Sequence, residues 1–313
     1  MTLLFRDPLF QRHETGRHPE RPARLAVIES RLENAGLAAQ CVAGKYQPLS
    51  ADAVAEVHTP SVVADVRKLA ESGGGWLEAD TLVSPPSYEV ALAAAGACVA
   101  GVDQVMRGVD PTALCLVRPP GHHATPTRSM GFCLFNNIAL AAHHARKTFG
   151  LSRILIVDWD VHHGNGTQDI FWTDPTVHFI SIHRFGHGFY PGTGNSDETG
   201  SGAGLGHTVN VPIHYGASRT DYRGAFRNAI EKAADHIKPE LILLSAGFDA
   251  HVRDPIGSLG LEAEDFAEMT RMLRSVATAH CHGRLVSCLE GGYHLEALAE
   301  SVQAHLEELL HPM

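Results

Sequence analysis

Short apolar runs alternate with longer segments of helical period along most of this chain, and no other feature restricts the fold as strongly. The runs are rich in Ile, Val and Leu and cover residues 114–117, 154–157, 178–182, 241–245 and 285–289. Because most of them are continuously apolar, they predict strands covered on both faces, as in a parallel sheet. Segments with apolar residues at helical spacing lie between and after them, over residues 135–149, 221–237, 262–279 and 295–310. The pattern predicts an α/β fold, with a largely parallel β-sheet flanked by helices on both faces.

The first third of the chain predicts helices and loops but no strand. The helical segments cover residues 20–35, 61–72 and 88–107. No internal repeat or linker divides the chain, and 44% of its 313 residues are hydrophobic, enough for a large core. We therefore expect a single domain over residues 1–313.

Charge, hydropathy and cysteine content restrict the binding partners and the cellular location that we expect for this protein. The formal net charge of -10 argues against a nucleic-acid partner, which needs a clustered basic face. The chain opens without a secretory-signal pattern, and its longest apolar run, residues 90–102, is too short to span a bilayer. The six cysteines include no Cys-x-x-Cys motif, which favours a reducing compartment. We expect a cytoplasmic protein with no membrane partner; its oligomeric state stays open.

Carboxylates and imidazoles follow two of the predicted strands and suggest a metal site. Asp158, Asp160 and His162 come directly after residues 154–157, and on a continued strand they would share one face. Asp249 follows residues 241–245, and the carboxyl ends of parallel strands are where open α/β sheets bind ligands. Asp160, His162 and Asp249 would suit a divalent ion such as zinc, with positions left for a carbonyl and a water. The alternative is that these residues cap turns by bonding local backbone.

Two further strand ends carry candidates for proton transfer and for anion stabilisation. His122 and His123 follow the run 114–117, and adjacent histidines in different surroundings can differ in pKa. Tyr293 follows Glu290-Gly291-Gly292, where glycines allow close backbone approach and a phenol could stabilise an oxyanion. The plainer alternatives are a core histidine beside a surface one, and a tyrosine packed on a glycine turn.

Together these segments resemble the zinc-dependent histone deacetylase family, including its bacterial deacetylase-like and acetylpolyamine amidohydrolase members. The resemblance covers essentially the whole chain, is closer to class II than to class I, and implies the arginase-deacetylase fold. The motifs that carry it, in chain order, are His18-Pro19-Glu20-Arg21-Pro22, Arg118-Pro119-Pro120-Gly121-His122-His123, Gly131-Phe132-Cys133, Val157-Asp158-Trp159-Asp160-Val161-His162-His163-Gly164-Asn165-Gly166, Tyr190-Pro191-Gly192-Thr193-Gly194, Ala246-Gly247-Phe248-Asp249 and Glu290-Gly291-Gly292-Tyr293.

The resemblance implies hydrolysis of an acyl-lysine side chain, or a similar acyl-amine, to the free amine and acetate. Asp160, His162 and Asp249 would bind zinc, His122 and His123 would form the tandem pair, and Tyr293 would polarise the acetyl carbonyl. Tyr293 also separates this chain from the weakly active class IIa members, which carry histidine there.

The resemblance also implies a substrate tunnel. Phe132 and Tyr190 would form its walls, Gly131 would line it, and Asp80 would grip the substrate at the rim. Arg21 would lie near an inner cavity.

Potassium is implied near the zinc. Its ligands would come from Asp158, Asp160, His162, Ser181 and Ile182, several through main-chain carbonyls. A second potassium would involve Phe171, Asp174 and Val177.

The tandem histidines would have unlike partners, Asp158 for His122 and Asn165 for His123. A carboxylate raises the pKa of an imidazole and an amide does so far less. We therefore hypothesise that His123 stays neutral and acts as the base, and that His122 acts mainly through its charge.

Substrate choice depends on the residue after Arg253-Asp254-Pro255. Polyamine-preferring animal relatives place a glutamate there, whereas this chain has Ile256. This favours acyl-lysine, with acetylpolyamine hydrolysis as the alternative, since Glu78 or Asp80 could supply an acidic gate. The physiological substrate and the acyl length stay open.

Two other functions fit these residues less well. Arginase-like ureohydrolases bind two manganese ions through additional aspartates, but Asn165 carries no charge where a second ion would need a ligand. A binding protein without catalysis would retain the pocket to read acyl groups, but here every motif residue required for catalysis is present.

Overall fold

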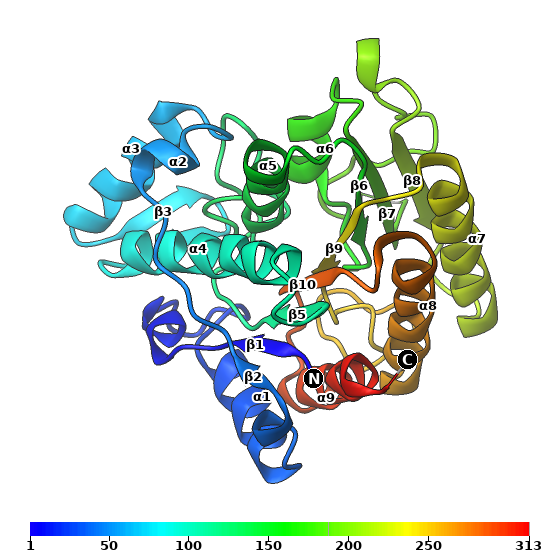
Figure 1. The fold of residues 1–313 in the computed structure, drawn as a ribbon. Coiled ribbons are helices and arrows are strands. Elements are labelled where there is room, and N and C mark those ends of the chain that lie inside the picture. The colour runs from blue at the N-terminus through cyan, green and yellow to red at the C-terminus, as the bar shows by residue number, and fades with distance from the viewer. Residues whose placement is uncertain (187, 313) are drawn as a thin grey trace.

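The core of the protein is an eight-stranded sheet with helices on both faces (Figure 1). The computed structural model describes residues 1–186 and 188–312. The strand order is β2-β1-β5-β10-β9-β6-β7-β8, and every pairing within the described sheet is parallel. The predicted fold class is therefore confirmed.

Five of the eight strands are the predicted apolar runs, with ends that differ by up to two residues. The strands of the sheet are β1 (Leu3–Phe5), β2 (Val42–Ala43), β5 (Thr112–Cys115), β6 (Ile154–Asp158), β7 (Val177–Arg184), β8 (Thr208–Ile213), β9 (Leu241–Ala246) and β10 (Leu285–Leu289). A separate antiparallel hairpin consists of β3 (Gly75–Glu78) and β4 (Thr81–Val83).

The prediction that the first third contains no strand was wrong. β1 has three residues and β2 has two, too few to show a periodic pattern. β8 was also not predicted, because Asn210 and Pro212 interrupt its apolar residues. Proline is tolerated there because β8 lies at the edge of the sheet.

The predicted helices are all present. The helices are α1 (Ala23–Asn34), α2 (Ala51–Val54), α3 (Pro60–Glu71), α4 (Ser87–Met106), α5 (Asn137–Phe149), α6 (Asn165–Phe171), α7 (Arg219–Ile237), α8 (Ala263–Cys281) and α9 (Leu295–Leu310). α5 begins two residues after the predicted start, because the Asn136 side chain caps it by accepting from the amide of Ala139.

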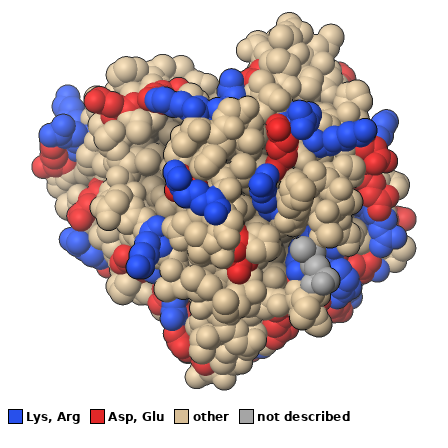
Figure 2. All heavy atoms as spheres, viewed as in Figure 1, with Lys and Arg blue, Asp and Glu red and all other residues tan. Residues whose placement is uncertain are grey.

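The helices divide between the two faces of the sheet (Figure 1). α4, α5 and α6 lie on one face, and α1, α7, α8 and α9 lie on the other. On the surface shown in Figure 2, basic and acidic side chains are interspersed.

α4 corrects the argument from apolar length. Within the described chain it is the one helix long and apolar enough to cross a membrane, so the view that this segment is too short was wrong. However, 61% of its most apolar window is buried inside the protein. Its contacts with β5, β10 and α5 account for its hydropathy.

The sheet brings the sequence motifs to one edge. β5, β10, β9 and β6 are neighbours and parallel, so their carboxyl ends lie side by side. The loops after these four strands carry His122, Tyr293, Asp249 and His162, in that spatial order. Residues more than a hundred positions apart therefore meet at one site.

Candidate active site

Asp160, His162 and Asp249 form a buried group whose ligand atoms all lie within 4.8 Å of one another. His162 Nδ1 is 3.0 Å from an Asp160 carboxylate oxygen and 3.2 Å from Asp249 Oδ2. Asp249 Oδ2 is buried and has no partner in hydrogen-bond geometry among the described residues. Two carboxylates and one imidazole are a donor set that zinc accepts, so the residues present fit a divalent ion.

The loop after β6, rather than strand alternation, brings two of these ligands together. β6 ends at Asp158, so the premise that Asp158, Asp160 and His162 share a strand face was wrong. Instead, Asp160 Oδ1 accepts a hydrogen bond from the backbone N–H of His162 at 2.9 Å. Asp158 is turned away toward His122.

Two glycines allow neighbouring backbone to approach the ligands. A Cβ atom at Gly247 would lie 2.1 Å from Asp160 Oδ2, and one at Gly291 would lie 2.2 Å from Asp249 Oδ2. The amide of Gly291 donates to Asp160 Oδ2 at 2.8 Å. Any side chain at either position would displace a ligand oxygen.

The tandem histidines have different partners. His122 Nδ1 lies 2.9 Å from Asp158 Oδ2, and His123 Nδ1 lies 2.7 Å from Asn165 Oδ1. Both rings are buried, with centroids 3.9 Å apart. The two side chains therefore share a location but not an electrostatic environment.

That difference separates the two pKa values. Burial opposes the charge on His122, but the carboxylates of Asp158 and Asp160 outweigh it and raise the pKa of His122 to about 10. Burial and the neighbouring His122 hold the pKa of His123 well below its ordinary value. These opposite shifts favour the charged form of His122 and the neutral form of His123 at neutral pH.

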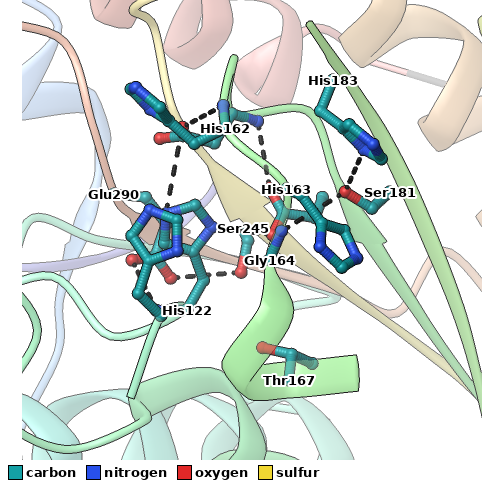
Figure 3. Close-up of polar contacts among 12 residues, drawn as sticks. His122, His162, His163, Gly164, Thr167, Ser181, His183, Ser245 and Glu290 are labelled. Carbon is teal, nitrogen blue, oxygen red and sulfur yellow. Dashed lines mark hydrogen bonds and ion pairs between the residues drawn. The ribbon is translucent and has the colours of Figure 1, made fainter. Parts of the chain in front are cut away.

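Glu290 holds the backbone under the tandem pair, a role that sequence reasoning missed. Its buried carboxylate accepts from the amides of Gly121 and His122 at 2.7 and 3.2 Å, and from the Ser245 hydroxyl at 3.1 Å. Figure 3 shows Glu290 beside His122 and Ser245. The sequence signals were a carboxylate at the end of an apolar strand and its place in the Glu290-Gly291-Gly292-Tyr293 motif.

Tyr293 is held by two residues that sequence reasoning also missed. Its amide donates to Asp254 Oδ2 at 2.7 Å, and the Arg24 guanidinium lies 5.1 Å from its ring centroid. Arg24 also donates to the carbonyl of Gly292 at 2.7 Å, so it contacts both the backbone and the ring of this segment. Burial raises the pKa of Tyr293 well above its ordinary value, which keeps the phenol protonated.

Asp254 also holds the loop that carries Ile256. Its Oδ1 accepts from the amides of Ile256 and Gly257, both at 2.9 Å, while its Oδ2 accepts from Tyr293. An Asp before Pro is a turn signal that could have found it in the sequence.

The predicted tunnel residues surround the site. Tyr190 packs edge-on against His123 with centroids 5.0 Å apart, and Phe132 packs edge-on against Tyr293 at 5.8 Å. A Cβ atom at Gly131 would lie 2.4 Å from the His123 ring.

Asp80 lies in the turn between β3 and β4 and connects to Phe132 through Thr81. The Thr81 hydroxyl donates to Asp80 Oδ1 at 2.8 Å and accepts from the amide of Phe132 at 3.1 Å. The Thr81 hydroxyl thus links the Asp80 carboxylate to the backbone of Phe132.

The residues named for potassium fall into two places. Asp158 is opposite Ser181 in the pairing of β6 with β7, and the buried Ile182 follows. The Ser181 hydroxyl is hydrogen bonded to His183 at 2.9 Å, and Figure 3 shows this pair beside His163. In the second place, Phe171 ends α6, Val177 begins β7, and Asp174 between them pairs with Arg146 at 2.5 Å.

A parallel α/β sheet with a carboxylate–imidazole trio and a paired histidine at its strand ends is the arrangement of a metal-dependent hydrolase. A model of the histone deacetylase domain matches residues 18–309. The chain belongs to this family, whose members are zinc-dependent amidohydrolases.

Relatives with established names support this membership. The chain is 43% identical over 301 residues to human polyamine deacetylase HDAC10, covering 93% of this chain but only 44% of that protein. It is 38% identical over 276 residues to the histone deacetylase-like amidohydrolase of Pseudomonas aeruginosa, covering 88% and 72%. The crystal structure of the HDA15 HD domain superposes with a TM-score of 0.93 at 38% identity, covering 99% of this chain and 88% of that one.

Proposed function

We propose that this protein hydrolyses the amide of acyl-lysine side chains or similar acyl-amines, releasing the free amine and a carboxylate such as acetate. The observation that carries the proposal is that His122 is paired with the Asp158 carboxylate and His123 with the Asn165 amide, next to a buried trio of metal-ligand residues. We further propose that residues 1–313 act as one catalytic domain.

Asp160, His162 and Asp249 would hold the catalytic zinc. When bound, zinc polarises an amide carbonyl and makes water a better nucleophile at neutral pH. Asp158, Ser181 and Ile182, with main-chain groups of Asp160 and His162, would hold a structural potassium.

The remaining chemistry belongs to the side chains of this protein. Neutral His123 takes a proton from the attacking water as the oxygen–carbon bond forms, and returns it to the amine nitrogen as the carbon–nitrogen bond breaks. The Tyr293 phenol donates a hydrogen bond to the carbonyl oxygen as negative charge develops there. His122 stabilises that charge as an imidazolium and keeps its proton.

The tunnel residues would orient the substrate. Phe132 and Tyr190 would pack on the methylene stem and exclude water, and Asp80 would accept a hydrogen bond from the substrate at the rim. The six free cysteines are compatible with a cytoplasmic location, which we also propose.

A second candidate is acetylpolyamine hydrolysis, favoured by the 43% identity to a polyamine deacetylase. Against it stands Ile256, an apolar side chain with no means to select a second ammonium group. We therefore place acyl-lysine first.

Acetate release from an acetyl-lysine peptide tests the activity. We expect turnover by the zinc-loaded protein, loss of turnover after chelation, and recovery when zinc is restored. His123→Ala should abolish turnover while metal content stays unchanged; near-native turnover by this variant would refute the assignment of the base. Competition between the peptide and acetylputrescine ranks the two substrate classes, and a preference for acetylputrescine would replace the first candidate by the second.

A further inference from the structure

A second group of histidines lies at the opposite end of the sheet from the catalytic loops. His178 is the second residue of β7, His207 immediately precedes β8, and His236 lies in the last turn of α7. These three histidines, with Arg153 and Thr176, line a cavity of about 210 Å³. We call it the histidine cavity.

Buried ring nitrogens in this cavity lack partners. His178 is only 4% exposed, yet neither of its ring nitrogens has a hydrogen-bond partner among the described residues. His207 Nδ1 is buried and unpartnered in the same way. Because buried polar groups are normally hydrogen bonded, three such atoms around one cavity point to a ligand.

The chemistry of the cavity favours a cation over an anion. Burial, with neighbouring His207 and His236, lowers the pKa of His178 to about 4, so this ring is neutral and offers lone pairs to a metal. The last residues of α7 line the cavity, and the C-terminal end of a helix favours positive charge. The charge of Arg153 is already engaged, by Glu240 at 3.3 Å and by the carbonyl of Lys238 at 3.0 Å.

The spacing of the His178 and His207 rings suits a shared metal. Two imidazoles on one tetrahedral zinc, with Zn–N bonds of about 2.0–2.1 Å, have ring centres roughly 5 Å apart. The His178 and His207 centroids are 5.7 Å apart, with the ring planes 67° from each other. His236 lines the same cavity from the last turn of α7, and its exposed side chain must move closer to the other two to share the ion.

We propose that His178, His207 and His236 bind a divalent transition-metal ion of the kind that prefers imidazole, such as Zn²⁺, Ni²⁺ or Cu²⁺. The site is separate from the catalytic trio, since it lies where β7 and β8 begin rather than where strands end. A metal there connects the edge strand β8 and its neighbour β7 to helix α7, and so stabilises the open edge of the sheet.

The test is a titration of the zinc-loaded enzyme with Cu²⁺, followed by dialysis and metal analysis. The wild-type protein should retain one Cu²⁺ beside the catalytic ion, with nitrogen hyperfine structure in its electron paramagnetic resonance spectrum. His207→Ala and His236→Ala should retain the catalytic ion only. His214→Ala, which removes an exposed histidine outside the cavity, should behave as the wild type.

Several outcomes would overturn the proposal. These are a wild-type protein that retains no additional ion, a His207→Ala variant that retains it, or saturable binding of inorganic phosphate that the same substitutions abolish. His236 is at the surface, so its replacement leaves the fold intact, and unchanged peptide hydrolysis by that variant verifies this.

Discussion

His123 Nδ1 lies 2.7 Å from the amide oxygen of Asn165, so Nδ1 carries the hydrogen and the other ring nitrogen keeps a free lone pair. The adjacent His122 has a carboxylate at the same point of its ring. The partner of each ring therefore determines its role. The amide partner leaves His123 as the base, and the carboxylate partner makes His122 the fixed charge.

Asn165→Asp should abolish that division. A carboxylate in place of the amide favours the imidazolium and raises the pKa of His123. Because the base must be neutral, the acidic limb of the pH profile of kcat/KM should move to higher pH. An unchanged limb would show that His123 does not set it.

Tyr293→Phe should slow hydrolysis without weakening substrate binding. The lost hydrogen bond acts on charge that develops at the carbonyl oxygen, and such donors contribute about 10²–10³ in kcat. Steady-state kinetics on an acetyl-lysine peptide should show this loss with little change in KM. A loss confined to KM would place the phenol in ground-state binding instead.

Gly291→Ala should impair metal binding. The new Cβ would lie 2.2 Å from Asp249 Oδ2 and 2.5 Å from Asp160 Oδ2, so both ligands must shift. Metal analysis after dialysis should give substoichiometric zinc, and activity should fall with it. Gly224→Ala is the matched control, because nothing lies within 4 Å of a Cβ there.

Glu20 makes the fold sensitive to acid. Burial opposes its ionisation, but Arg118 and Arg24 overcome this and lower the pKa of Glu20 to about 2. Since the folded pKa lies below the ordinary value of 4.5, the stability from ionised Glu20 is present above pH 4.5 and is lost as pH falls toward 2.

Glu20→Gln should lower the free energy of unfolding by roughly 3–5 kcal/mol at neutral pH, because two buried arginines lose their counter-charge. Urea unfolding at several pH values measures both effects, and the variant should lose stability less steeply between pH 4.5 and 2. Glu33→Gln, at an exposed pair with Arg6, should change little. Equal effects of the two substitutions would exclude a special role for Glu20.

The sequence was most informative where burial is complete. The bounds of β9 and β10 were predicted to within one residue. Both faces of these strands are covered, so every residue in them is buried and the whole strand is visible as an apolar run. β1 and β2 were not predicted, because strands of three and two residues are too short to show a periodic pattern of apolar residues.

The site was predictable as a set of residues but not as a geometry. Asp160, His162 and Asp249 come together, although the loop after β6, not the strand, arranges the first two. Glu290 shows that contacts between distant residues could not be predicted from the sequence. Its carboxylate meets the amide of Gly121 across 169 positions, and only the strand order of the sheet determines that contact.

The contacts of Asp254 matter for any redesign of the substrate entrance around Ile256. One oxygen of Asp254 accepts from the amide of Ile256 and the other accepts from the amide of Tyr293. A substitution of Ile256 that moves its backbone would therefore also shift Asp254 and, through it, the position of Tyr293. Altered selectivity and altered speed should arise together, and a library that diversifies the entrance should leave this aspartate untouched.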